Sequence, residues 1–353
     1  MTEHHPQLSG ISLADLEAYL MNWQQPRYRA RQIIQWRNKG IVNPAEMLNI
    51  PARLRELLLE KLQCQPILLL RKQVSSDGTR KYLFTLQSSG KSIETVFIPE
   101  ASRGTVCISS QLGCVLDCPF CYTGTQGFAG NLSAGEIVAQ ILAVKHDLLS
   151  DPMDRNFCNT ATHIVYMGMG EPMANERGVH DSIALISSPD GLNISRRRIT
   201  VSTSGLVPQI ERLGAAFPVN LAISLHAASD ELRDVLVPIN AKYPLKQLRK
   251  CLNNYPLGKQ RHITLEYVML TDINDRTEDL AALARFVNPD RERINLISFN
   301  PYPGSPYTGS SKEHMNKFAK DLIKKGIRAT VRRSRGQDIM AACGQLKAVV
   351  ASV

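Results

Sequence analysis

The sequence has 353 residues, of which 43% are hydrophobic and 21% are charged, as in an ordinary globular protein rather than a disordered or fibrous one. Its 42 Lys and Arg residues outnumber its 32 Asp and Glu residues, and the net charge of +10 favours contact with a polyanion. No apolar run approaches the ~20 residues that cross a bilayer and no signal segment opens the chain, so we expect a cytoplasmic protein with no membrane partner and with reduced cysteines.

The first hundred residues are predicted to form a small α+β accessory domain. Leucines at helical spacing predict short helices between residues 12 and 64. The period then changes to two, and Asp77-Gly78 marks a hairpin turn, which predicts strands at 68–74, 81–87 and 93–99. We therefore expect one domain at 1–100 and a second at 101–353.

The second domain alternates short apolar strands with amphipathic helices. The strand candidates are 105–109, 163–168, 198–204, 219–226, 263–270, 294–300 and 328–333. Between the first two, Ser133 and Glu136 have the spacing of a capping box at the start of a helix. Such alternation requires a parallel sheet, so the fold class is α/β, with the ligand beyond the carboxyl ends of the strands.

Three cysteines lie close together in "GCVLDCPFC", namely Cys114, Cys118 and Cys121. A closed zinc site needs four ligands, and no fourth Cys or His lies at finger-like spacing, since Cys158 is far along the chain. A redox dithiol would use only Cys118 and Cys121. A 4Fe-4S cluster held by three thiolates leaves one iron open to bind a ligand. The spacing favours this open cluster, with zinc and the dithiol as alternatives.

The cysteine motif resembles that of the radical S-adenosylmethionine (SAM) superfamily, because it follows the first strand of a βα array. Further motifs end later strands: "GMGEP" at 168–172, "STSG" at 202–205, "SLH" at 224–226 and "NPYPG" from Asn300. Together with "TQGFAGNL" and "DIMAACGQL", they resemble the RlmN family, whose members methylate C2 of adenine in 23S ribosomal RNA and transfer RNA. The resemblance implies a partial (β/α) radical SAM barrel over 101–353 and an RNA-binding role for 1–100.

This resemblance also implies the cofactors and the chemistry. It implies one 4Fe-4S cluster on Cys114, Cys118 and Cys121, with exchangeable SAM on the open iron and two SAM molecules used per turnover. In the implied mechanism Cys343 carries the methyl group, Cys107 releases the methylated RNA by forming a disulfide with Cys343, and Glu94 accepts a proton. The implied cofactor contacts are Gly170, Glu171, Ser202, Ser224, Leu225, His226 and Asn300.

The implied partners are 23S rRNA at its peptidyl-transferase region, tRNA at the adenine 3′ to the anticodon, and an electron donor such as flavodoxin or ferredoxin, for a monomeric enzyme. Candidate RNA contacts are Arg27, Arg29, Arg31, Arg37, Lys39, Arg196, Arg197, Arg198, Arg332, Arg333 and Arg335, with Trp23, Tyr28, Trp36 and Phe128 as candidates for base stacking. Three alternatives stay open: a Cfr-like C8 methyltransferase, a radical enzyme for a protein or metabolite, and a non-catalytic RNA-binding module with structural zinc.

Overall fold

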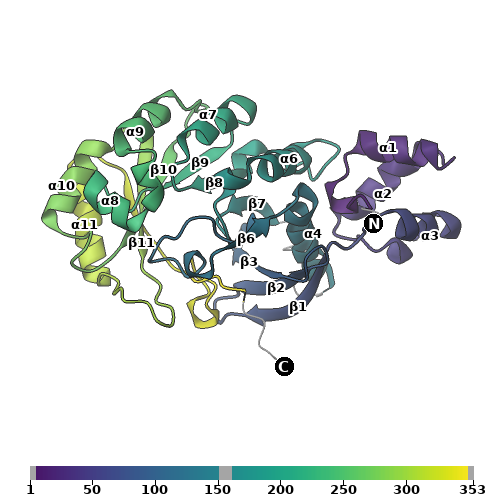
Figure 1. The fold of residues 1–353 in the computed structure, drawn as a ribbon, viewed down its shortest axis with the longest axis horizontal. Coiled ribbons are helices and arrows are strands. Elements are labelled where there is room, and N and C mark those ends of the chain that lie inside the picture. The colour runs from purple at the N-terminus through teal and green to yellow at the C-terminus, as the bar shows by residue number, and fades with distance from the viewer. Residues whose placement is uncertain (1–4, 151–160, 349–353) are drawn as a thin grey trace.

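The protein consists of a small helical unit attached to one end of a larger body of strands and helices (Figure 1). This computed structural model describes residues 5–150 and 161–348, so the cysteine at position 158 lies outside the described residues. The helical unit contains α1 (Leu13–Asn22), α2 (Arg29–Asn38) and α3 (Ala52–Lys61).

The helical unit has a hydrophobic core of its own, which extends from Leu8 to Cys64. In α1, Leu16 and Leu20 recur at helical spacing and are completely buried. The Ser12 side chain caps this helix by accepting a hydrogen bond from the backbone N–H of Asp15 (3.1 Å). Local sequence signals and burial therefore agree, and the predicted short helices are confirmed.

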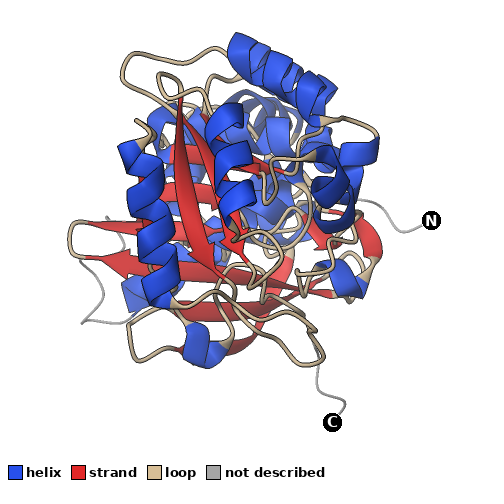
Figure 2. Ribbon diagram, turned by 90° about the vertical axis from the view of Figure 1, so that its left-hand side faces the viewer, coloured by secondary structure: helices blue, strands red, loops and turns tan. Residues whose placement is uncertain are grey.

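The larger body is organised around one open sheet of ten strands in the order β1-β2-β3-β4-β7-β8-β9-β10-β11-β12 (Figure 2). The strands are β1 (Ile67–Val74), β2 (Arg80–Leu86), β3 (Ser92–Glu100), β4 (Arg103–Cys107), β7 (Ala161–Tyr166), β8 (Ile199–Thr203), β9 (Asn220–Ser224), β10 (Ile263–Met269), β11 (Glu292–Ser298) and β12 (Ala329–Arg332). Strands β1 to β4 pair antiparallel, whereas β4 and the strands that follow pair in parallel. All ten strands overlap the predicted ranges, and the α/β class with its open (β/α) array is confirmed.

Helices cover the parallel strands. They are α4 (Ala134–Ser150), α6 (Glu176–Ser187), α7 (Val207–Ala216), α8 (Asp230–Leu236), α9 (Leu245–Asn254), α10 (Thr277–Phe286) and α11 (Lys312–Lys324). The predicted capping box opens α4, because Ser133 N–H donates to the Glu136 carboxylate (2.8 Å) and Glu136 N–H donates to Ser133 Oγ (3.1 Å). None of the described helices is long and apolar enough to cross a membrane.

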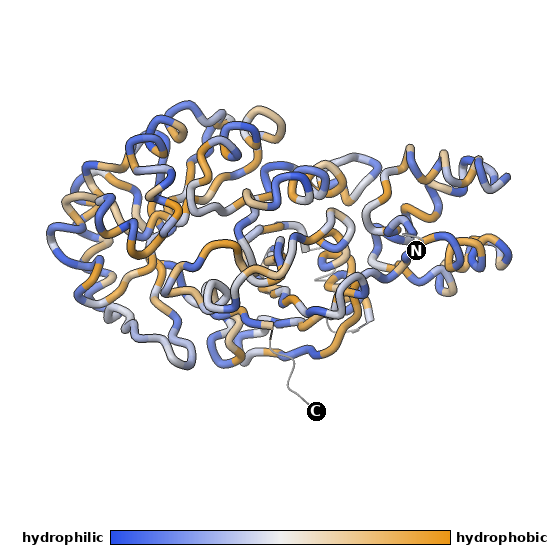
Figure 3. The backbone as a smooth tube through the Cα atoms, in the orientation of Figure 1, coloured by the Kyte–Doolittle hydropathy of each residue, from blue (hydrophilic) through white to orange (hydrophobic). Residues whose placement is uncertain are grey.

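The strands of the parallel sheet are apolar because helices and loops exclude water from them. In β9, Leu221, Ala222 and Ile223 are each at most 1% exposed. The hydropathy colouring shows apolar segments running through the interior of the body and polar segments on its outer helices (Figure 3). The same core continues into β1–β3, so the sheet has no break near residue 100. The predicted domain boundary at that position stays a prediction.

One feature of the fold was not predicted from the sequence. A separate two-stranded ribbon, β5 (Gln111–Gly113) with β6 (Phe128–Asn131), pairs across the cysteine motif. Its strands have only three and four residues, which is too short for a periodic pattern to be visible. The ribbon makes the cysteine motif a closed loop whose two ends are fixed together.

Candidate active site

The predicted cofactor residues gather in one cavity at the carboxyl ends of the parallel strands. The cavity has a volume of about 160 Å³. Ten of the predicted residues line it, namely Cys114, Cys118, Cys121, Gly170, Glu171, Ser202, Ser224, His226, Asn300 and Cys343. Leu225 is fully buried beside it, Cys107 lines a smaller neighbouring cavity, and Glu94 is buried on β3. The geometry brings these residues to one place, while their individual roles stay predictions.

The three motif cysteines lie on the loop that the β5–β6 ribbon closes. Cys114 N–H donates to the Gly127 carbonyl (3.0 Å), and Cys121 N–H donates to the Cys118 carbonyl (3.1 Å). A Cβ at Gly124 would lie 2.9 Å from that Cys118 carbonyl oxygen, so the turn needs glycine there. Burial and the neighbouring thiols raise the pKa of Cys118 well above its usual range. Three free thiols on one cavity wall are a donor set that fits a 4Fe-4S cluster with one open iron.

Glu171 connects two of the strand-end loops. Its Oε1 accepts a hydrogen bond from Met173 N–H (3.0 Å) and its Oε2 accepts one from Ser204 N–H (2.8 Å). Burial raises the pKa of this carboxyl group. The preceding Gly170 has φ +96°, and a Cβ there would lie 2.4 Å from the side chain of Gln111. The position of Glu171 in the cavity wall is therefore fixed from both sides.

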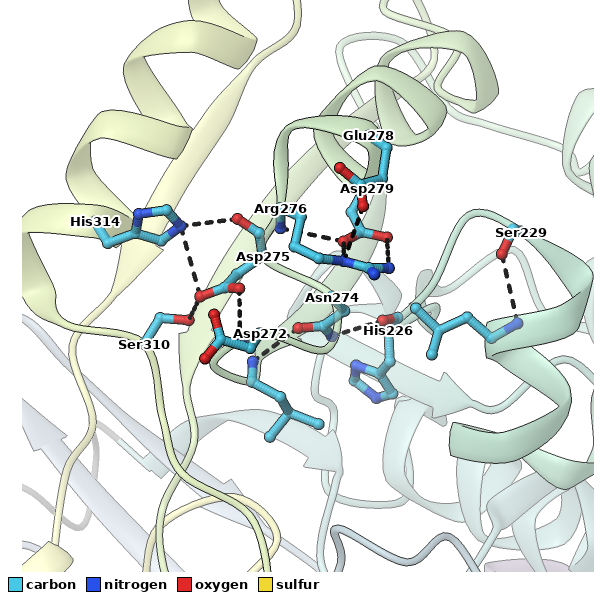
Figure 4. Close-up of polar contacts among 12 residues, drawn as sticks. His226, Ser229, Asp272, Asn274, Asp275, Arg276, Glu278, Asp279, Ser310 and His314 are labelled. Carbon is cyan, nitrogen blue, oxygen red and sulfur yellow. Dashed lines mark hydrogen bonds and ion pairs between the residues drawn. The ribbon is translucent and has the colours of Figure 1, made fainter.

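His226 supports the cysteine loop from the end of β9. Its Nδ1 accepts a hydrogen bond from Val268 N–H (3.1 Å), so the proton of the neutral ring lies on Nε2. Burial and the nearby Arg233 lower the pKa of His226 to about 3, and the ring stays neutral at physiological pH. The ring packs edge-on against Phe120 of the cysteine motif, with 4.8 Å between centroids. Figure 4 shows the buried Asn274 side chain, which donates to the His226 carbonyl (2.8 Å).

Arg233 on α8 is a buried residue of the site that sequence reasoning missed. Its guanidinium donates to the carbonyls of Leu225 (3.1 Å), Ser204 (2.6 Å) and Ser224 (3.2 Å), and to Asn240 Oδ1 (2.8 Å). It is 0% exposed, and burial lowers its pKa to about 10. A single arginine in a helical pattern is usually a surface residue, so no sequence signal pointed to it. It ties the ends of β8 and β9 together under the cavity.

The loop that carries Cys343 packs directly against the cysteine motif. Tyr122 N–H donates to the Gly344 carbonyl (2.8 Å), and Thr123 Oγ1 donates to the Leu346 carbonyl (2.6 Å). These contacts join residues more than two hundred positions apart in the chain. They place Cys343 in the wall of the cavity that the motif cysteines line.

A smaller cavity of about 40 Å³ adjoins the Cys343 loop. It is lined by Cys107, Asn300 and Arg332 as well as by Cys343. Both cysteines are free thiols, and burial together with Cys343 raises the pKa of Cys107 to about 12. Arg332 lines both cavities, and its pKa is raised mainly by Cys343 and also by Glu266. Arg332 was predicted to contact RNA; the structure places it in the wall of the site, and the RNA contact itself stays a prediction.

The start of the Cys343 loop is held by the β1–β2 hairpin turn. Gly336 N–H donates to Asp77 Oδ2 (3.0 Å), and Arg335 Nε pairs with the same oxygen (3.1 Å). Ser75 Oγ donates to Asp338 Oδ1 (2.6 Å). Arg335, another predicted RNA contact, is thus engaged within the protein. The hairpin of the predicted accessory domain therefore takes part in positioning the site.

Comparisons with known proteins agree with this geometry. A family model described as "Radical SAM superfamily" matches residues 108–286, and one described as "Ribosomal RNA large subunit methyltransferase N-terminal domain" matches residues 7–64. The dual-specificity RNA methyltransferase RlmN of Rhodopseudomonas palustris strain BisB18 is 45% identical over 356 residues, which cover 97% of this chain and 89% of that protein. The RlmN of Parvibaculum lavamentivorans is 47% identical over 358 residues, with the same coverage of both chains. The chain belongs to the RlmN family.

A solved structure supports the same conclusion for RlmN-family membership. The crystal structure of a radical SAM methyltransferase from Sphaerobacter thermophilus superposes with a TM-score of 0.91 at 42% identity, covering 98% of this chain and 100% of that one. The match to the RlmN N-terminal domain coincides with the separate core of the helical unit. This chain is therefore a radical SAM methyltransferase built as a whole like its relatives.

The predicted RNA contacts of the RlmN N-terminal unit divide into exposed and buried residues. Arg27, Arg31 and Lys39 are exposed. Arg37 is 2% exposed, and its guanidinium donates to the Ile11 carbonyl (2.6 Å), so the prediction that it contacts RNA is wrong. Its burial lowers its pKa to about 10. An arginine in a basic helix gives no sequence signal that separates a structural role from an RNA-binding one.

Proposed function

We propose that this chain methylates C2 of a specific adenine in 23S rRNA, and of the adenine 3′ to the anticodon in tRNAs, through an S-methylated Cys343. One observation carries the proposal: Cys343 stands in the wall shared by two cavities, with the three motif cysteines on one and Cys107 on the other. A sulfur in that position can take a methyl group on one side and meet a second thiol on the other. We also propose a cytoplasmic monomer with a flavodoxin or ferredoxin as electron donor.

The target carbon explains why such a site is needed. C2 of adenine lies between two ring nitrogens and is electron-poor, so it does not attack a methyl donor by simple displacement. When bound, the 4Fe-4S cluster and SAM supply the radical that removes a hydrogen atom from the S-methyl group of Cys343. Cys114, Cys118 and Cys121 would hold the cluster, and the open iron would take SAM, with two SAM molecules used per turnover. The residues of the chain then have to bind, orient and release the RNA.

The proposed SAM contacts surround the cysteine loop. Glu171 offers a fixed carboxylate toward the amino group of SAM, and the neutral His226 offers an Nε2–H donor. Asn300 both lines the cavity and donates its Nδ2 to the Cys343 carbonyl (3.1 Å), so it connects this binding site to the methyl acceptor. Gly170, Ser202, Ser224 and Leu225 complete the proposed set.

Release of the product uses Cys107. Once a CH₂ group bridges Cys343 and adenine, the Cys107 sulfur attacks the Cys343 sulfur and forms an S–S bond. The S–CH₂ bond breaks with its electron pair on carbon, and that carbon takes up a proton and becomes the methyl group. The proton of the Cys107 thiol balances the proton that the carbon gains. The two sulfurs are oxidised and the carbon is reduced, so the release step itself needs no further reactant.

Two cysteine variants test the proposal, because the two thiols act at different steps. Cys343→Ala should abolish methylation of both protein and RNA and leave cluster assembly intact. Cys107→Ala should trap RNA on Cys343 through a one-carbon bridge, detected as a nuclease-trimmable mass on the purified protein. The double variant should carry no bridge. Normal RNA methylation by both single variants would rule out the covalent mechanism and favour a radical enzyme with another substrate.

The remaining alternatives predict other outcomes of the same preparations. A Cfr-like enzyme would give adenine methylated at C8, which nucleoside mass spectrometry separates from the C2 isomer. A non-catalytic RNA-binding module would contain zinc and would not cleave SAM. The family assignment and the position of Cys343 favour the C2 methyltransferase over both.

A further inference from the structure

A buried ion pair lies beneath the Cys343 loop. Lys81 on β2 places its Nζ 3.0 Å from Glu94 Oε1 on β3, and the side chains are only 9% and 2% exposed. Lys81 pairs in the sheet with Val96, which pairs in turn with Cys107 on β4. Lys81, Glu94 and Cys107 therefore project from the same face of three neighbouring strands, the face that the Cys343 loop covers.

Both members of the pair also bind the Cys343 loop, one on each side of the cysteine. Lys81 Nζ donates to the Met340 carbonyl (3.2 Å), three residues before Cys343. Glu94 Oε2 accepts a hydrogen bond from Lys347 N–H (2.9 Å), four residues after it. Each carboxylate oxygen of Glu94 thus has one partner. In this arrangement the Lys347 N–H occupies one acceptor position of Oε2, and movement of Lys347 would leave that position to another proton donor.

We propose that Lys81 is a positioning residue that, together with Glu94, clamps the Cys343 loop above Cys107, so that withdrawal of the loop frees Glu94 to accept a proton. The inference rests on the proposed function, in which Cys107 must lose its thiol proton before it attacks Cys343. The freed Oε2 takes that proton, and the proton then passes to the methylene carbon as the S–CH₂ bond breaks. Movement of the loop and the availability of the base are therefore coupled.

Charge explains why a lysine is needed here. Burial raises the pKa of Glu94, whereas Lys81, the Lys347 N–H and, more weakly, Arg71 on β1 lower it. Met169, whose sulfur accepts a hydrogen bond from the Glu94 backbone N–H, is uncharged. Burial already outweighs these effects, and without Lys81 the pKa of Glu94 rises further, so less of the carboxyl group is ionised at neutral pH.

The test uses Lys81→Met in the full-length enzyme, isolated with its RNA. The expected result is a covalent RNA bridge on Cys343 that accumulates at pH 7, although Cys107 is present, because release is slower than in wild type. When the crosslinked variant is moved to higher pH, release should recover relative to wild type. Lys81→Arg, which keeps the charge, should restore release at pH 7. The matched control is Lys72→Met, since Lys72 on β1 pairs with Asp147 (2.7 Å) and not with Glu94.

A second readout needs no turnover. Amide hydrogen exchange at residues 341–347 should be faster in Lys81→Met than in wild type or Lys72→Met, because one side of the clamp is lost. If Lys81→Met does not fold, Lys81→Gln replaces it, since Gln can donate to the Met340 carbonyl but carries no charge. If Lys81→Met releases RNA as fast as wild type at every pH and its amide exchange at 341–347 is unchanged, the inference is wrong. Absence of the bridge in Cys107→Ala would instead overturn the proposed function, and exchange at 341–347 would still test the clamp.

Discussion

At the scale of single residues, the site depends on where a few side chains project. The three motif cysteines and His226 could be predicted from the sequence because their motifs end strands, and the carboxyl ends of parallel strands meet at one edge. Cys343 was predicted through the family resemblance alone. Arg233 and Asn274 could not be predicted, because their side chains donate hydrogen bonds to backbone carbonyls that only the fold brings within reach. Arg37 was misinterpreted for the same reason, as charge alone does not indicate burial.

The first prediction at this scale concerns the cluster ligands. Replacing Cys114, Cys118 or Cys121 by Ala should remove the brown colour and the iron from anaerobically purified protein, because each thiolate would hold one iron of the proposed cluster. The matched control is Cys251→Ala, since Cys251 is equally a free cysteine but is buried on α9 outside both cavities. Iron and sulfide analysis with the visible spectrum measures the outcome. A colourless wild-type protein with stoichiometric zinc would contradict the assignment.

The second prediction separates two neighbouring arginines. Arg332→Gln should reduce RNA methylation strongly and leave RNA affinity nearly unchanged, because Arg332 lines both cavities that contain Cys343 in their walls. Arg333→Gln, one residue away and exposed, should do the reverse and weaken RNA binding slightly. Binding measured by fluorescence anisotropy, alongside methylation rates, distinguishes the two. If Arg332→Gln loses as much RNA affinity as activity, Arg332 contributes mainly to RNA binding.

At the scale of elements, the sequence predicted which segments form but not which of them cooperate. The period-two pattern correctly predicted β1–β3, yet nothing in it indicated that their turn contacts a loop more than 250 positions later. The β5–β6 ribbon was missed because its strands are too short to show a period. Contacts between distant segments depend on the register of the whole sheet, which a local pattern does not contain.

The hairpin contact yields the third prediction. Asp338→Ala removes the acceptor for Ser75 Oγ and for Ser76 N–H (3.0 Å), so the loop that follows should open more often. Amide exchange at residues 336–347 should become several-fold faster, while exchange in β1 and β2 stays unchanged. Asp321→Ala is the control, because Asp321 pairs only with Lys324 on the exposed side of α11 (2.9 Å). Equal exchange in both variants would show that the hairpin does not hold the loop.

At the scale of the whole molecule, a body built on one open sheet carries the candidate site, and a helical unit with exposed basic residues projects from its end (Figure 1). With a net charge of +10, RNA affinity should fall steeply with salt, with a log–log slope of roughly −0.7 to −0.9 per phosphate contact. Replacing Arg27 and Arg31 by Gln should flatten that slope. Filter binding across a salt series measures it. RNA binding that does not change with salt would show that the protein makes no substantial contacts with the phosphate backbone.

The central claim is that this chain methylates C2 of adenine in RNA through Cys343. The most direct measurement is mass spectrometry of nucleosides from 23S rRNA and tRNA of cells that lack the chain, express it, or express Cys343→Ala. The account predicts 2-methyladenosine in both RNAs only with the unaltered chain, and none with the variant. Adenosine methylated at C8 instead, no methylated adenosine at all, or full C2 methylation by Cys343→Ala would contradict it.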